Sequence, residues 1–222
     1  MEQEPLVVDI NNDGLLDIYV SQVGDFLTVK GRNHLYICQG IENGIPVYAD
    51  QAIQYGLDLV GFGTQAAFLD YDMDGDLDMF QLNHSVHANG TFGQNGPLRY
   101  PTPTAGDKLM RNDGGKFTEV TLKAGIKSSV IGYGLGIAVG DVNLDGWPDI
   151  YIGNDFHEND YLYINQKMAR SANASQTASG IPVSFPWGWI LPTQNNDGWN
   201  EIFSLDMLPG RSLYTEELSR RR

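Results

Sequence analysis

A nine-residue pattern, Asp-x-[Asp/Asn]-x-Asp-Gly-x-x-Asp, occurs three times in this chain and constrains its fold more than any other feature. The three copies span residues 9–17, 70–78 and 141–149, and are called the first, second and third loops below. A loop that recurs at long and similar intervals is typical of a repeated structural unit. We therefore interpret residues 1–166 as three copies of one unit.

The segments that flank the loops are typical of β-strands. Short β-branched and aromatic runs, IYV, MFQL and IYIG, follow the last Asp of each copy. Further strand signals lie at residues 33–37, 107–111 and 160–164, at 61–70 and 132–141, and at the start of 46–57 and 116–126. Each of the last two segments ends in a short amphipathic turn. The sequence thus predicts an all-β chain with about four short strands per unit.

Four short antiparallel strands in a repeated unit favour a β-propeller blade, because radial stacking covers sheet faces that one blade cannot bury alone. Repeats of a β-sandwich are the alternative architecture. At about 60 residues per unit, the 222 residues hold about 3.5 blades, whereas propellers close with roughly 4 to 8. We expect a propeller fragment whose remaining blades are missing from this chain.

Oxygen-bearing side chains at alternate loop positions are typical ligands of a hard cation. Calcium accepts a flexible oxygen cage, whereas magnesium prefers a stricter octahedron that retains waters, so Ca²⁺ is the favoured ion. We assign positions 1, 3, 5 and 9 as side-chain ligands and position 7 as a main-chain carbonyl ligand. The predicted ligands are Asp9, Asn11, Asp13, the Leu15 carbonyl and Asp17; Asp70, Asp72, Asp74, the Asp76 carbonyl and Asp78; and Asp141, Asn143, Asp145, the Trp147 carbonyl and Asp149.

The loops do not fit an EF-hand, which needs a bidentate Glu at position 12 and a helix on each side. Val20, Gln81 and Ile152 occupy that position. An Asx-rich turn that binds no ion is the simplest alternative. Because crowded carboxylates repel one another, we expect ion-free loops to destabilise their sheets and metal binding to be coupled to folding.

Several longer stretches carry a family resemblance: GFGTQAAFLDYDMDGDLD, FTEVTLKAGI, GWPDIYIGNDFHENDYLYIN and the NxLYxN-type strands. They resemble the FG-GAP repeat, also known as the VCBS repeat, which integrin α-chain propellers carry. More closely, residues 5–166 resemble the cartilage acidic protein family, whose bacterial members carry an ASPIC and UnbV domain that is absent here. The resemblance implies an extracellular or cell-surface, calcium-stabilised propeller that acts in adhesion or binds a protein or glycan.

Composition argues against other partners. With 28 Asp and Glu against 14 Lys and Arg, the net charge of −14 would repel nucleic acid and anionic lipid head groups. No apolar run is long enough to cross a membrane, and MEQEPLVVDI lacks the layout of a signal peptide, so we expect no membrane insertion and no signal peptide in this chain. The single cysteine, Cys38, excludes an internal disulfide framework.

Residues 167–194 differ in character from the rest, because they contain no Asp or Glu. The repeat predicts a glycine turn, a strand and a loop start there, and the segment matches none of them. Back-translation with an offset of one nucleotide permits the missing residues, so we hypothesise that 167–194 and the tail 210–222 are out of frame. Residues 195–209 then form a partial fourth repeat with Thr193 at the first ligand position.

Candidates for catalysis are few. Asp155, His157 and Glu158 could supply a general base or a further metal ligand, and they carry the alternative hypothesis of a propeller hydrolase or lyase. An ordinary turn between strands explains the same residues. The insertion at 85–105 is typical of a long surface loop, which often carries recognition. We therefore expect a non-enzymatic binding module.

Overall fold

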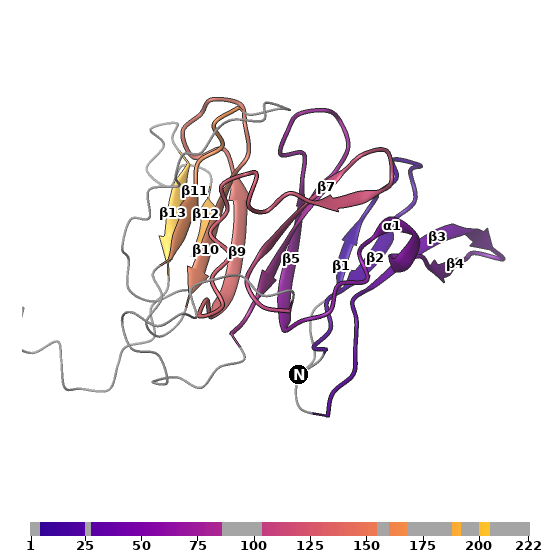
Figure 1. The fold of residues 1–222 in the computed structure, drawn as a ribbon. Coiled ribbons are helices and arrows are strands. Elements are labelled where there is room, and N and C mark those ends of the chain that lie inside the picture. The colour runs from indigo at the N-terminus through magenta and orange to yellow at the C-terminus, as the bar shows by residue number, and fades with distance from the viewer. Residues whose placement is uncertain are drawn as a thin grey trace, which may run out of the picture.

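The computed structural model describes residues 5–24, 28–85, 104–154, 160–167, 188–191 and 200–204. Within these ranges the chain forms thirteen strands in antiparallel sheets and one short helix (Figure 1). The predicted all-β class is confirmed. No helix in this part of the chain is long and apolar enough to cross a membrane.

The first sheet is a meander in which each strand pairs with the next. Its strands are β1 (Leu6–Val8), β2 (Asp17–Val20), β3 (His34–Glu42) and β4 (Ile45–Asp50). The first loop joins β1 to β2. Helix α1 (Ala52–Tyr55) follows β4 and ends at Gly56, whose φ of 77° lies in the left-handed region that glycine adopts without strain. A strand followed by a short turn was predicted here.

The second sheet repeats this plan, and the third repeats it as far as the described residues extend. The second contains β5 (Gly63–Leu69), β6 (Asp78–Asn83), β7 (Lys108–Asn112) and β8 (Phe117–Glu119), and the third contains β9 (Gly134–Gly140), β10 (Asp149–Asn154) and β11 (Tyr161–Tyr163). The second and third loops join β5 to β6 and β9 to β10. Every loop therefore occupies the same place in its sheet.

A two-stranded sheet of β12 (Gly188–Leu191) and β13 (Glu201–Ser204) follows. The expectation that residues 167–194 lack a strand is wrong for β12, which pairs antiparallel with β13 from Gly188 opposite Ser204 to Leu191 opposite Glu201. The short apolar run GWIL satisfies its main-chain groups through this pairing. The reading-frame hypothesis stays a prediction, and most of 167–194 and all of 210–222 lie outside the described residues.

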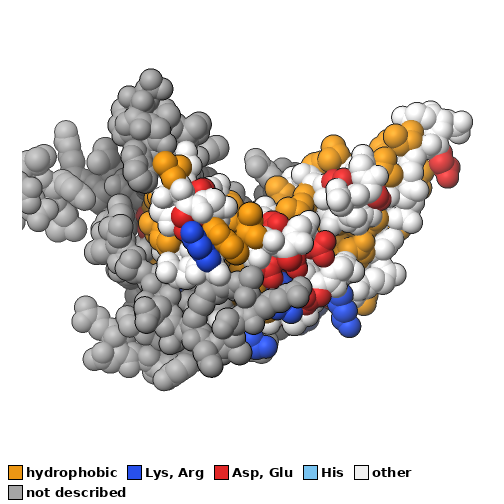
Figure 2. Space-filling model, turned by 90° about the horizontal axis from the view of Figure 1, so that it is seen from above, with side chains coloured by type: hydrophobic (Ala, Val, Ile, Leu, Met, Phe, Trp, Pro, Cys, Tyr) orange, Lys and Arg blue, Asp and Glu red, His pale blue; other side chains and the backbone are white. Residues whose placement is uncertain are grey.

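The sheets follow one another side by side through their first strands (Figure 1). β1 packs against β5, β5 against β9, and β9 against β12. Consecutive meanders that stack in this way have the arrangement of neighbouring propeller blades. The described residues form no closed ring. The three loops lie along the upper edge in Figure 1, and Figure 2, which looks onto that edge, shows acidic side chains gathered there among apolar ones.

Two apolar clusters hold the first three sheets together. Alternate side chains of β6 enter different clusters, with Met79 facing the first sheet and Phe80 and Leu82 facing the third. All six residues of β6 are buried, as are all six of β10. Because both faces of these strands are covered, they fix the spacing of the sheets. The second and third loops end where β6 and β10 begin, so the spacing of these loops is fixed as well.

The contact between the first and second sheets also contains a buried polar network. Gln81 Oε1 accepts hydrogen bonds from the Tyr19 hydroxyl at 3.0 Å and from Asn33 Nδ2 at 2.9 Å. Gln81 Nε2 donates to the Gln65 carbonyl at 2.9 Å. The corresponding residue of the third sheet is Ile152, which lies in the apolar cluster against the second sheet. The two inter-sheet contacts therefore differ in chemistry.

Candidate metal centre

The three loops share one hydrogen-bonded frame. In each loop the first Asp accepts the main-chain N–H groups of positions 5 and 6, at distances of 2.7 to 3.1 Å. The glycine at position 6 has a φ of 85°, 98° and 88° in the three loops, which favours glycine over any other residue. These turns curl each loop back toward its first Asp.

The aspartate at position 5 supports position 7. Its Oδ1 accepts the N–H of position 7 at 2.8 to 3.0 Å in every loop. The Asp76 carboxylate accepts the N–H of Gly114 at 3.0 Å, in the turn between β7 and β8, so this side chain has a partner outside its own loop. The ligand role of the Leu15, Asp76 and Trp147 carbonyls stays a prediction.

The aspartate at position 9 is the most buried member of each loop. Asp17, Asp78 and Asp149 are each 0% exposed. Each accepts two main-chain N–H groups. One comes from position 2 of its own loop, at 2.9 to 3.1 Å. The other comes from Cys38 within β3, Asn112 at the end of β7 or Asn165 just beyond β11, at 2.7 to 2.8 Å. The backbone thus holds a carboxylate at the base of every loop.

Burial raises the pKa of all three of these carboxyl groups. The pKa of Asp78 is raised to about 7, mainly by burial and also by the charges of Asp72 and Asp74, against the opposing amides of Asn112 and Tyr71. The charged form is therefore costly in the ion-free loops, and a bound cation would offset that cost.

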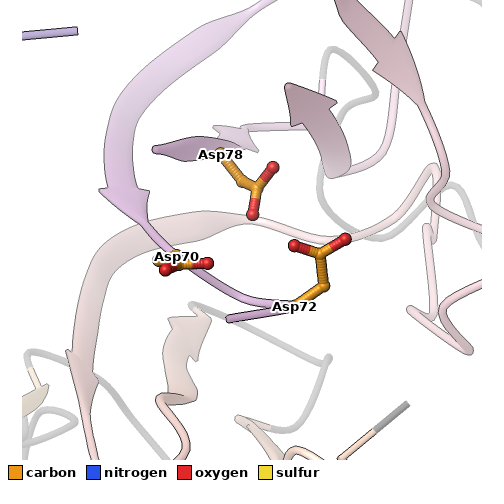
Figure 3. A group of neighbouring side chains, drawn as sticks. All are labelled: Asp70, Asp72 and Asp78. Atoms are coloured by element: carbon orange, nitrogen blue, oxygen red, sulfur yellow. The ribbon is translucent and has the colours of Figure 1, made fainter. Parts of the chain in front are cut away.

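The second loop draws its carboxylates together most closely (Figure 3). One oxygen atom from each of Asp70, Asp72 and Asp78 lies within 4.8 Å of the others, and no second group of acidic, His or Cys side chains this close occurs in the described part of the chain. Two oxygen atoms bound to one calcium ion at about 2.3 to 2.6 Å are at most about 5 Å apart, so this donor set fits the ion. In the first and third loops an asparagine, Asn11 or Asn143, takes the place of Asp72.

The role of the last residue of the NxLYxN pattern, which lies in or just after the third strand, was not predicted from the sequence. Asn112 and Asn165 donate side-chain hydrogen bonds to the carbonyl of position 8, at Leu77 (3.1 Å) and Pro148 (3.3 Å). Cys38 takes this place in the first sheet, where its thiol lies 3.6 Å from the Gly40 carbonyl. The signal was available, because extending the three aligned strands by one residue gives LYIC, LMRN and LYIN.

A lysine side chain lies beside the third loop. Lys167 Nζ is 3.5 Å from Oδ2 of Asp145, a predicted ligand. This ammonium group partly neutralises the loop in the ion-free state, and it would compete with a metal ion for the same oxygen.

Several predicted functional residues cannot be placed. Asp155, His157 and Glu158, most of the insertion at 85–105, and residues 193–199 of the fourth repeat lie outside the described residues. Asn200, just before β13, donates its side-chain N–H to the Asp141 carbonyl of the third loop at 2.7 Å.

One of the three units matches a known repeat family. Residues 133–164 match the model of the FG-GAP repeat, and this stretch contains β9, the third loop, β10 and β11. The comparison with curated proteins found no match. The finer resemblance to the cartilage acidic protein family stays a prediction. Residues 133–164 are an FG-GAP repeat, built on the same loop frame as the two units that precede it.

Proposed function

We propose that this chain is a calcium-binding repeat module with one Ca²⁺ site in each of its three loops. The observation that carries the proposal is the loop frame itself, in which the same hydrogen bonds recur three times and bring Asp70, Asp72 and Asp78 within 4.8 Å in the second loop. FG-GAP repeats often bind calcium, which supports the same assignment for the third loop.

Each part of the loop has a distinct task in this proposal. The buried aspartate at position 9 provides an oxygen fixed by two amides, and the aspartates at positions 1 and 5 present oxygens while they hold the turn. Bound calcium supplies a divalent charge that offsets the repulsion between the carboxylates. The ion would thereby stabilise the junction between the first two strands of each sheet.

The setting that we propose is an extracellular or cell-surface β-propeller. FG-GAP repeats typically occur in such proteins, and calcium sites of modules outside cells typically bind at about 0.1 to 1 mM. We further propose a non-enzymatic role in which the module presents its surface loops to a protein or glycan partner. The repeated loops act on stability in this view, and recognition falls to other segments.

The experiment is a thermal melt of the full chain in about 5 mM calcium and again in excess chelator. At the affinity above, each loop contributes about 1 to 2 kcal/mol to the free energy of unfolding. We expect calcium to raise the melting temperature by roughly 10 °C. The triple variant Asp13→Ala, Asp74→Ala, Asp145→Ala should lose this rise, because it removes position 5 from every loop.

The matched control is Glu42→Ala, which removes an exposed acidic side chain at the end of β3, outside the loops. Its response to calcium should equal that of the parent chain. If the parent chain melts at the same temperature with calcium and with chelator, the loops are Asx turns that bind no ion, and the proposal is wrong.

A further inference from the structure

Asn165, two residues beyond β11, contacts two loops at once. Its main-chain N–H donates to Asp149 at 2.7 Å, and its side-chain Nδ2 donates to the Pro148 carbonyl at 3.3 Å, both in the third loop. The same Nδ2 lies 2.7 Å from the carbonyl of Tyr71, which belongs to the second loop. Neighbouring sheets are therefore joined at the level of two candidate ion sites.

A path of short hydrogen bonds connects the buried ligand of one loop to that of the next. The Tyr71 N–H donates to Asp78 at 2.9 Å, while the Tyr71 carbonyl accepts from Asn165. Asn165 in turn donates its N–H to Asp149. Because Asp78 and Asp149 are both 0% exposed, the two ends of this path lie in a low-dielectric region where hydrogen bonds are strong.

The first loop has no equivalent tie among the described residues. Asn112, the counterpart of Asn165 in the second sheet, donates its side-chain hydrogen bond to Leu77 of its own loop and to no residue of the first loop. The geometry thus separates the loops into a tied pair, the second and third, and one independent member.

From this path we infer that Asn165 is a positioning residue shared by two calcium sites, and that it makes calcium binding to the second and third loops cooperative. The inference rests on the proposed function. When the second loop is filled, Asp78 and the Tyr71 peptide bonded to it become ordered, which fixes the acceptor of Asn165. Asn165 then holds Asp149 in place before the third loop binds its ion, so that binding step costs less conformational entropy.

The test follows two amide resonances of the nitrogen-labelled full chain during a calcium titration. The N–H groups of Gly75 and Gly146 report their own loops, because each donates to the first Asp of its loop. Asp74→Ala disables the second loop by removing an exposed ligand. We expect the calcium midpoint of Gly146 to rise about fivefold, the lower end of typical coupling. By reciprocity, Asp145→Ala should raise the midpoint of Gly75 by the same factor.

Two comparisons identify the route of this coupling. Asp13→Ala in the first loop is the matched control, and it should leave the Gly146 midpoint unchanged. Asn165→Cys removes the side-chain donor and retains the main-chain N–H, and cysteine is the residue that the first sheet has at this place. In the Asn165→Cys background, Asp74→Ala should move the Gly146 midpoint by less than about twofold, because the tie is cut.

Two outcomes overturn the inference and leave the proposed function standing. If Asp74→Ala leaves the Gly146 midpoint unchanged, or lowers it as mutual repulsion of two ions would, the loops are not cooperative. If the fivefold rise persists in Asn165→Cys, the coupling runs through another contact, such as β5 against β9. A parent chain in which neither glycine responds to calcium overturns the proposed function, and the inference with it.

Discussion

The first and second repeats have the same backbone plan but different side chains at three places around the loop. Asn11 in the first repeat corresponds to Asp72 in the second, Cys38 to Asn112, and Asn33 to Asp107. The last pair performs one task with different chemistry: Asn33 accepts the N–H of Gln22 at 2.8 Å, and Asp107 accepts that of Asn83 at 2.9 Å. The comparison teaches that main-chain hydrogen bonds set the frame, and that these three side chains can adjust each site separately.

The largest difference in calcium affinity between the first and second loops should come from the charge of the residue at loop position 3. Asp72→Asn removes one of the four carboxylates predicted as side-chain ligands in the second loop, and Asn11→Asp adds a fourth to the first. A unit charge about 4 Å from another interacts with about 1 to 4 kcal/mol near a protein surface. We expect the calcium midpoint reported by Gly75 to rise about tenfold in Asp72→Asn, and that reported by Gly14 to fall by a similar factor in Asn11→Asp.

The amide resonances of Gly14 and Gly75 provide a control for each other in this experiment, since each variant should move only its own midpoint. Equal midpoints for the two loops in the parent chain and in both variants would contradict the assignment of position 3 as a ligand.

A smaller difference in calcium affinity should follow from the exchange of Asn112 and Cys38. Asn112→Cys removes the side-chain hydrogen bond to Leu77 and the one that Asn112 accepts from the Gly115 N–H in the next turn, and it keeps the main-chain N–H that Asp78 accepts. Of these changes, the lost bond to Leu77 acts directly on the loop. One such bond is worth about 1 kcal/mol, so the second loop should bind calcium about fivefold more weakly. Cys38→Asn, the reverse exchange, should strengthen calcium binding by the first loop, because it adds an amide at the place from which Asn112 bonds to Leu77. Isothermal titration calorimetry of both variants measures the change, and an unchanged second loop would show that Asn112 acts only through its backbone.

The smallest expected difference between the two repeats lies in how their stability depends on pH. Burial raises the pKa of Asp107 to about 7, against the opposing amide of Asn83, whereas an unfolded Asp titrates near 4. Between about pH 4 and pH 7 the folded chain thus binds a proton that the unfolded chain has lost. The resulting stabilisation is complete below that window and is lost as the pH rises to about 7. Asp107→Asn gives the second repeat the side chain of the first and should remove this dependence.

The measurement is the melting temperature of Asp107→Asn and of the parent chain, in calcium, between pH 5 and pH 7. We expect the difference between the two curves to change by a few °C across this range, with the parent chain losing more stability as the pH rises. Parallel curves would mean that Asp107 stays charged in the folded chain.

Local pattern was enough to predict the strands and loops, because the period of two and the Asp-rich turns are properties of neighbouring residues. Spacing alone predicted that Asp70, Asp72 and Asp78 approach one another, but it also placed Asp74 with them, and Asp74 is not part of that close group. Their role as metal ligands stays a prediction. Asn112, Asn165 and the Tyr71 carbonyl could not be assigned a role in the same way, since their side-chain contacts with the loops join residues that are 17 to 94 positions apart. The pairing of β12 with β13 was missed because composition suggested an anomaly where a short apolar strand was present.

The network around Gln81 bears on how such a chain avoids misassembly. Repeated units that resemble one another can stack in the wrong order as they fold, because each exposes a similar apolar face. Gln81 Oε1 accepts hydrogen bonds from Tyr19 and Asn33 of the first sheet, while Gln81 Nε2 donates to carbonyls of its own sheet. Ile152, the corresponding residue of the third sheet, requires no polar partner. A neighbouring sheet without donors at these two places would leave the buried Gln81 Oε1 unpaired, at a cost of about 1 to 3 kcal/mol. Gln81 thereby favours a neighbouring sheet that carries hydrogen-bond donors at the places of Tyr19 and Asn33.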